Sequence, residues 1–208
     1  MYLIIFTGAP ASGKSTIASF FAKEMAVPFL SKDEIKVSLF EKYGFNSNEE
    51  RTKLSIQAEE MLYQDIATYI NKNENIIVDN FFENFDRIKS IVENKTNCII
   101  ICFNLISDNR KLADRYNKRI SNGNRHISLY TIDVYPVING KSTFHKKATK
   151  QDFDKVMKRV TENTYGNYVY DINTNDIEDN FDEIVCRLRE NIELSMEMDN
   201  CDRTGLSR

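Results

Sequence analysis

The sequence contains few residues that bind metals through side-chain nitrogen or sulfur, with four cysteines and two histidines in 208 residues. No two cysteines form a C-x-x-C pair, and His126 and His145 lack the spacing of a metal-binding pair. These absences argue against a structural zinc site. Cys98 and Cys102 lie inside an apolar run typical of a strand, so we expect buried, reduced thiols, as in a cytoplasmic protein.

Long hydrophobic runs are also missing. No apolar stretch approaches the length of a membrane-spanning helix, and residues 2–6 are too short for the hydrophobic region of a signal peptide. The hydrophobic fraction of 41% and the charged fraction of 28% are typical of soluble globular proteins. We therefore expect a cytoplasmic protein with no membrane partner. Residues 1–195 should form one domain, followed by an acidic tail at 196–208, where the apolar period fades as it does in disordered termini.

A broadly basic surface is absent as well, because the net charge is −3. The charge is nevertheless uneven: residues 108–147 contain nine Lys or Arg against three Asp, whereas residues 171–208 contain eleven Asp or Glu against four Arg. The composition argues against a non-specific nucleic-acid binder, which needs a broader basic surface. The basic middle segment favours an anionic ligand.

The most informative stretch that is present lies at residues 8–16. It matches the pattern G-x-x-x-x-G-K-[ST], and it stands between an apolar run at 2–6 and a helical pattern at 17–25, which is the context of a phosphate-binding P-loop. The backbone N–H groups of such a loop point at a phosphate. Lys14 can reach the β- and γ-phosphates, and the Ser15 hydroxyl can bind Mg²⁺. The predicted nucleotide-binding residues are Gly8, Ala9, Pro10, Ala11, Ser12, Gly13, Lys14, Ser15 and Thr16.

Strand-like runs alternate with helical patterns along the chain. This alternation predicts a parallel sheet covered by helices on both faces, a three-layer α/β fold of the P-loop NTPase type with five mainly parallel strands. Ligands of such sheets bind beyond the carboxyl ends of the strands. The expected strands are residues 2–7, 28–30, 75–79, 97–104 and 168–172, and the expected helices are 14–25, 33–40, 49–71, 85–93, 108–120, 150–162 and 178–190.

Two aspartates stand at predicted carboxyl ends of strands. Asp33 follows the 28–30 strand by three residues and is a candidate general base for an acceptor hydroxyl. Its alternative role is that of a first-turn residue in a helix that Ser31 caps. Asp79 ends an apolar-apolar-apolar-Asp run, the pattern of a Walker B carboxylate that holds Mg²⁺. Its alternative role is that of a turn residue.

The basic segment predicts a lid at about residues 108–147. Arg115 and Arg119 are four residues apart on one expected helix, so they share a face. Arginines on a lid can stabilise charge on a transferring phosphoryl group. A solvated basic helix is the alternative.

Other residues near these strand ends have two interpretations each. Lys36, one helical turn after Asp33, either binds an anionic part of an acceptor or is solvated. Phe81, Phe82 and Phe85 either line an acceptor pocket or pack on the sheet, and we expect packing for at least two of them.

Over roughly residues 1–125 the chain resembles small P-loop kinases of nucleotide-kinase-like fold. The resemblance is carried by residues 8–16, by Asp33 after the second strand, by 76–79 with the following Asn80, and by the two arginines of the expected lid. The group includes polynucleotide 5′-hydroxyl kinases, zeta-toxin-like kinases and chloramphenicol-phosphotransferase-like enzymes. It implies ATP or GTP and Mg²⁺ as cofactors, and Asp33 as the general base. The polynucleotide kinases carry an arginine at the position of Lys36, and lysine cannot make its bidentate phosphate contact.

The sequence thus predicts an ATP-dependent kinase that phosphorylates a hydroxyl of a small-molecule acceptor. The predicted catalytic residues are Lys14, Asp33, Arg115 and Arg119, and the predicted metal ligands are Ser15 and Asp79. Three alternatives stay open: a polynucleotide 5′-hydroxyl kinase with nucleic acid as acceptor, a nucleoside monophosphate kinase, and a regulatory P-loop ATPase that switches between partners.

Overall fold

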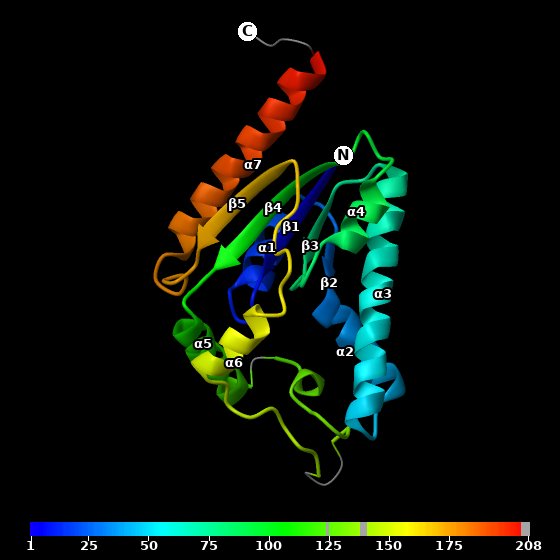
Figure 1. Ribbon diagram of the computed structural model, residues 1–208, viewed down its shortest axis with the longest axis vertical. Helices are drawn as coiled ribbons and strands as arrows, with labels where there is room; N and C mark the ends of the chain where they lie inside the picture. The colour runs from blue at the N-terminus through cyan, green and yellow to red at the C-terminus, as the bar shows by residue number, and fades with distance from the viewer. Residues whose placement is uncertain (124, 138–140, 205–208) are drawn as a thin grey trace.

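The computed structural model describes residues 1–123, 125–137 and 141–204. Its strands form one parallel sheet in the order β2-β3-β1-β4-β5 (Figure 1). This arrangement confirms the predicted five-stranded α/β fold of the P-loop type. The strands are β1 (Tyr2–Gly8), β2 (Phe29–Ser31), β3 (Ile76–Asp79), β4 (Ile99–Ile106) and β5 (Tyr168–Asn173).

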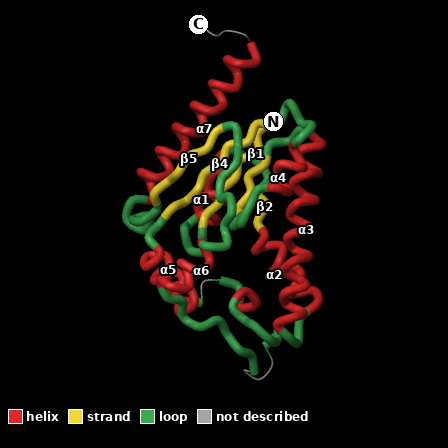
Figure 2. The backbone as a smooth tube through the Cα atoms, viewed as in Figure 1, coloured by secondary structure: helices red, strands yellow, loops and turns green. Residues whose placement is uncertain are grey.

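Seven α-helices and one short 3₁₀ helix connect these strands in the described part of the chain (Figure 2). All seven predicted helices are present, and an α2 longer than expected follows β2 directly. The helices are α1 (Lys14–Glu24), α2 (Lys32–Tyr43), α3 (Asn48–Lys72), α4 (Asp86–Val92), α5 (Asn109–Asn122), η1 (Ile127–Leu129), α6 (Lys150–Met157) and α7 (Phe181–Thr204).

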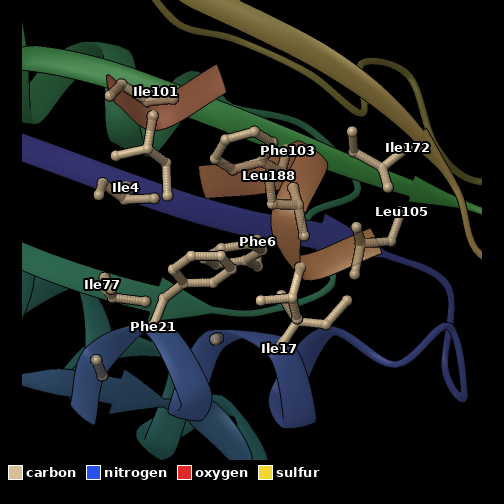
Figure 3. Packing of buried hydrophobic residues seen from close by; sticks show 14 of the residues in the cluster. Ile4, Phe6, Ile17, Phe21, Ile77, Ile101, Phe103, Leu105, Ile172 and Leu188 are labelled. Carbon is tan, nitrogen blue, oxygen red and sulfur yellow. The ribbon is translucent and has the colours of Figure 1, made fainter. Parts of the chain in front are cut away.

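The two faces of the sheet are buried by different helices because successive side chains of a strand point to opposite faces. On β1, Ile4 and Phe6 pack with α1 and α7, whereas Leu3 and Ile5 pack with α3 and α4. Figure 3 shows the face that α1 and α7 cover, where the ring of Phe6 lies near Phe21 of α1 and Phe103 of β4. Its centroid is 5.2 Å from that of Phe103. The apolar layers on both faces fix the sheet and leave the carboxyl ends of its strands free for a site.

The C-terminal helix extends further than the sequence predicted. α7 continues to Thr204, so residues 196–204 are helical where a fading apolar period indicated a tail. The helix stays in contact with the sheet through polar bonds that apolar periodicity does not reveal. The Tyr2 hydroxyl donates to Asp199 Oδ2 at 3.0 Å, and the hydroxyls of Tyr170 and Ser195 lie 2.9 Å apart. Residues 205–208 lie outside the described residues.

The cysteines of the strand-like run are buried, as predicted, while the other two are exposed. Cys98 and Cys102 are free thiols in the core, and burial raises the pKa of Cys102 to about 11. Such a thiol stays protonated and unreactive at neutral pH. Within the described ranges, no helix combines the length and the apolar character needed to cross a membrane.

Candidate functional site

The loop between β1 and α1 requires glycine at two positions. Gly8 has a φ of +140°, and a Cβ there would lie 2.5 Å from the carbonyl oxygen of Leu105. Gly13 has a φ of +95° and directly precedes the first residue of α1. Since side chains are strained at such φ values, the loop depends on glycine to bring its backbone close to a ligand. The N-terminus of α1 completes a cradle for an anion.

Lys14 is the first residue of α1, and its ammonium lies within this cradle. Its Nζ donates to the carbonyl oxygen of Ala9 at 3.2 Å. Burial lowers the pKa of Lys14, while nearby Asp79 raises it and Arg119 and Arg125 lower it further. A buried cation among other cations favours a bound anion, because the anion would supply the missing negative charge.

Asp79 ends β3 with only 3% of its surface exposed. The Ser31 hydroxyl donates to its Oδ2 at 3.5 Å, while Oδ1 is buried and has no hydrogen-bond partner among the described residues. An unpartnered carboxylate oxygen is costly unless a ligand satisfies it. Ser15 lines the same cavity as Asp79 and adds a hydroxyl. These oxygen donors fit Mg²⁺, which usually takes few protein ligands and completes its shell with phosphate and water.

A first cavity of about 590 Å³ opens beyond the carboxyl ends of β1, β2 and β3. It brings together four residues that the sequence singled out separately: Lys14, Ser15, Asp33 and Asp79. Phe81 also lines it, whereas Phe82 and Phe85 are 1% exposed and pack in the core, as expected for two of the three. Its other lining residues include Lys36, Arg51, Glu59, Glu60, Tyr63, Asn80, Glu83, Arg87, Tyr116, Arg119, Arg125, Leu129 and His145.

Asp33 lies in the first turn of α2, at the edge of this cavity. Its carboxylate forms an ion pair with Arg125, and Lys36 Nζ is 3.8 Å from Oδ1. Ser31 stands at the N-cap of α2, but its side chain makes no capping bond. Asp33 is therefore a first-turn residue of α2 that also lines the cavity, while its role as a general base stays a prediction.

A second cavity of about 840 Å³ lies on the other side of the P-loop. The helix α5, the loop between β5 and α7 and the first residue of α7 line it, the loop through Ile177 and Glu178 and the helix through Phe181. The two cavities share lining residues, including Ser15, Asp33 and Arg119. A ligand that extends from one cavity into the other would thus pass the P-loop and Asp33.

The two lid arginines that the sequence paired occupy different places. Arg119 lines both cavities, whereas Arg115 lines the second cavity alone. Arg115 Nη2 donates to the carbonyl oxygens of Thr174 and Asn175, each at 2.6 Å. The structure therefore does not bring Arg115 together with Lys14 and Arg119 in the first cavity. Its guanidinium binds the β5–α7 loop instead.

The segment after α5 crosses to α2 and α3 at the far end of the molecule from the C-terminus (Figure 1). Leu129 of η1 joins Phe40 and Phe45 in a small buried cluster. Tyr135 and Phe45 exchange two backbone hydrogen bonds, each of 2.8 Å. The expected lid segment is thus packed against α2 and the residues that follow it in this structure. Gly123, with a φ of +61°, ends α5, while Asn124 of the expected hinge and the expected loop residues 138–140 lie outside the described residues.

Several polar residues of the first cavity were absent from the predicted site, among them Arg51. Arg125 and His145 were expected only as parts of the lid at 108–147. Arg51 stands seven residues before Ala58, so it shares the buried stripe of α3, and a cation on an apolar stripe is a signal that could have revealed it. Arg125 and His145 belong to an irregular segment. Their positions depend on contacts between distant parts of the chain, for which a single sequence gives no signal.

Comparisons with known proteins agree with this geometry. A family model described as an AAA domain matches residues 3–132. A putative kinase from Chloroflexus aurantiacus is 24% identical, with 91% of this chain and 97% of that chain covered and a TM-score of 0.70. Shikimate kinase from Bacteroides thetaiotaomicron is 19% identical, with 92% of this chain and 98% of that chain covered and a TM-score of 0.56. A gluconokinase from Sinorhizobium meliloti is 14% identical, with 92% of this chain and 95% of that chain covered and a TM-score of 0.52.

The solved structures establish a similar fold, that of small P-loop kinases. No curated protein matches the chain. The narrower resemblance to polynucleotide, zeta-toxin-like and chloramphenicol-phosphotransferase-like kinases stays a prediction.

Proposed function

We propose that this chain, which belongs to the AAA domain family, is a kinase that transfers the γ-phosphate of ATP to a hydroxyl of a small-molecule acceptor. The observation that carries the proposal is the placement of Asp33. Its carboxylate lines both cavities, so it lies where a nucleotide bound at the P-loop would meet an acceptor. A protein that only hydrolyses nucleotide has no need of the first cavity beside the P-loop and Asp33.

The nucleotide occupies the P-loop and the second cavity. The loop N–H groups and Lys14 hold the phosphates, and the base lies toward α5 and the β5–α7 loop. Ser15 and Asp79 would hold Mg²⁺, which would neutralise charge on the phosphates. Nothing in the lining residues discriminates ATP from GTP, and we name ATP as the donor.

Asp33 acts on the acceptor hydroxyl in the first cavity. Its carboxylate accepts the hydroxyl proton while the hydroxyl oxygen bonds to the γ-phosphorus, and the bond from that phosphorus to the β–γ bridging oxygen breaks. Arg125 orients the carboxylate through their ion pair. Arg119 and Lys14 stabilise the charge that develops on the transferring group.

The size and closure of the first cavity support a small acceptor. The lid segment packs on α2 and α3 through Leu129, so a long polymer would have to displace it. Shikimate kinase and gluconokinase, by their names, act on small molecules, and both share the fold. Lys36 stands where polynucleotide kinases carry an arginine, which weakens the nucleic-acid alternative.

An acceptor screen with γ-labelled ATP tests the proposal. The panel should include nucleosides, sugars, sugar phosphates, antibiotics and 5′-hydroxyl oligonucleotides. Purified wild type should label a small molecule, while Asp33→Asn should label it far more slowly. Asp114→Asn, which makes the same change at an exposed aspartate of α5 that lines neither cavity, is the matched control and should behave as wild type. ATP hydrolysis without labelling of any panel member would contradict a kinase and favour the regulatory ATPase.

A further inference from the structure

Three side chains from distant segments meet in the first cavity, away from the P-loop. They are Lys36 on α2, Arg51 on α3 and His145 in the segment before α6, and we call them the cation cluster. Arg51 Nη2 lies 3.1 Å from His145 Nε2, so the guanidinium donates to a neutral imidazole. Figure 1 shows α2 and α3 side by side at the end of the molecule where these segments converge.

The cation cluster has too few anions around it. Arg51 makes no ion pair with a carboxylate within the described ranges, and its Nε is buried without a hydrogen-bond partner there. The Lys36 side chain is only 15% exposed, and its nearest carboxylate is that of Asp33, which Arg125 already engages. Buried charges and unsatisfied donors are costly unless something pairs with them.

The titration of these groups reflects the same excess of positive charge. Burial, together with the charges of Arg51 and Lys32, lowers the pKa of Lys36 to about 8. Burial also lowers the pKa of His145 to about 4, and the charges of Arg51, Lys36 and Arg125 act in the same direction. An anion bound here would reverse these effects, because it favours the protonated form of each group.

We infer that the cation cluster binds a phosphate group of the acceptor, so that the small-molecule substrate carries a phosphate monoester besides the hydroxyl that receives the γ-phosphate. The glutamates of the cavity are each paired with another cation: Glu59 with Lys32, Glu60 with Arg87 and Glu83 with Arg159. Lys36, Arg51 and the neighbouring Arg125 are thus left with the carboxylate of Asp33, and a phosphate dianion balances the difference. Arg51 can offer its free Nε–H and a second donor to two phosphate oxygens, as guanidinium groups do. Lys36 lies one helical turn from Asp33, so the phosphate and the reacting hydroxyl can belong to one small molecule. The inference rests on the proposed function.

Inorganic phosphate is the probe for this subsite, and His145 reports its binding. The protein has two histidines, so imidazole NMR signals can be assigned with His126→Gln. Saturating ADP and Mg²⁺ occupy the P-loop and keep phosphate out of it. With wild type, added phosphate should raise the pKa of His145 from about 4 toward its ordinary value. A titration of His145 that phosphate leaves unmoved would overturn the inference.

Arg51→Gln should weaken phosphate binding at least tenfold in the same experiment, and Lys36→Gln provides a second variant on another helix. Lys53→Gln is the matched control, because Lys53 stands on α3 with its side chain 70% exposed and should leave phosphate affinity unchanged. Equal phosphate affinity in wild type and in both cluster variants would contradict the subsite.

Kinetics with paired acceptors separate this inference from the proposed function. For a phosphorylated acceptor, Arg51→Gln should lower kcat/KM at least tenfold, and for the same acceptor without its phosphate it should have little effect. If the enzyme transfers phosphate but kcat/KM is the same with and without the acceptor's own phosphate, the subsite is wrong and the kinase stands. Phosphate binding without any transfer would overturn the kinase instead. A 3′-phosphorylated, 5′-hydroxyl oligonucleotide is the third arm, and its preferential labelling would contradict a small acceptor.

Discussion

The two cavities of this protein are built in different ways. In the proposed function, the nucleotide side depends on one contiguous loop, residues 8–16, whose shape two glycines and the start of α1 fix locally. The acceptor side is assembled from α2, α3 and the segment after α5, which lie far apart in the sequence and meet through Leu129 and its neighbours. Under the proposed function, a local motif therefore forms the donor side, and long-range packing forms the acceptor side. Substitutions on the two sides should therefore have separable effects.

Asp33→Asn should have the largest effect and should lower the rate of phosphoryl transfer rather than nucleotide binding. The amide keeps the size of the carboxylate but cannot accept the hydroxyl proton, so phosphoryl transfer should fall by roughly 10²–10⁴-fold. ATP affinity and thermal stability should stay close to wild type, as measured by calorimetry and thermal unfolding. A variant that loses stability but keeps its rate per folded molecule would show that Asp33 is structural only.

Lys14→Ala should damage the nucleotide side. Removal of the cation at the phosphates should lower kcat by a factor on the order of 10²–10³. This is the effect seen when one preorganised hydrogen-bond donor to a developing charge is lost. Folding should survive, and inorganic phosphate should still raise the pKa of His145. If Lys14→Ala consumed ATP at the wild-type rate, the assignment of the P-loop to catalysis would be wrong.

Arg119→Ala tests the junction of the two sides, because Arg119 lines both cavities. Loss of a hydrogen bond to a charged group costs about 1.5–3 kcal/mol, so kcat should fall by roughly 10–100-fold. ATP binding should weaken less, since the contact strengthens as charge develops on the transferring group. Arg110→Ala, in the first turn of α5 and lining neither cavity, is the control. Unchanged kinetics in Arg119→Ala would mean that Arg119 is a surface residue of α5 without a role in transfer.

The pH dependence should give the smallest effect and should again separate the two sides. Lys36 has a pKa of about 8 in the free protein, so it loses its charge as pH rises through that value. For a phosphorylated acceptor, kcat/KM should therefore fall above pH 8 by up to about tenfold per unit, while ATP affinity stays constant. Lys36→Arg, whose charge persists, should shift this loss to higher pH. A wild-type profile that is flat between pH 7 and 9.5 would contradict the assignment.

The parts of the molecule that the sequence could predict are those that local patterns encode. Apolar runs such as 76–79 and 99–106 marked the strands because a strand buried on both faces reads as a continuous hydrophobic segment. The P-loop was evident from residue spacing. Asp33 and Asp79 could be identified because parallel strands place their carboxyl ends at one edge of the sheet.

The acceptor side could not be predicted in the same way. Arg51 and His145 are 94 residues apart in sequence, and only the packing of the segment after α5 onto α2 and α3 brings them together. The helical face that Arg115 and Arg119 share was correctly placed on α5, but periodicity did not reveal that Arg115 binds the carbonyl groups of Thr174 and Asn175. The helix end at Thr204 was missed because hydroxyl and carboxylate contacts, such as that of Asp199, extend α7.

The most direct test of the central claim is the stoichiometry of transfer across the two cavities. With the acceptor that the labelling screen identifies, ADP and phosphorylated acceptor should be measured in the same reaction as ATP is consumed. The account predicts one phosphorylated acceptor for each ADP, with little free phosphate. ADP that forms at the same rate without acceptor, matched by free phosphate, would contradict it, because the γ-phosphate would then pass to water.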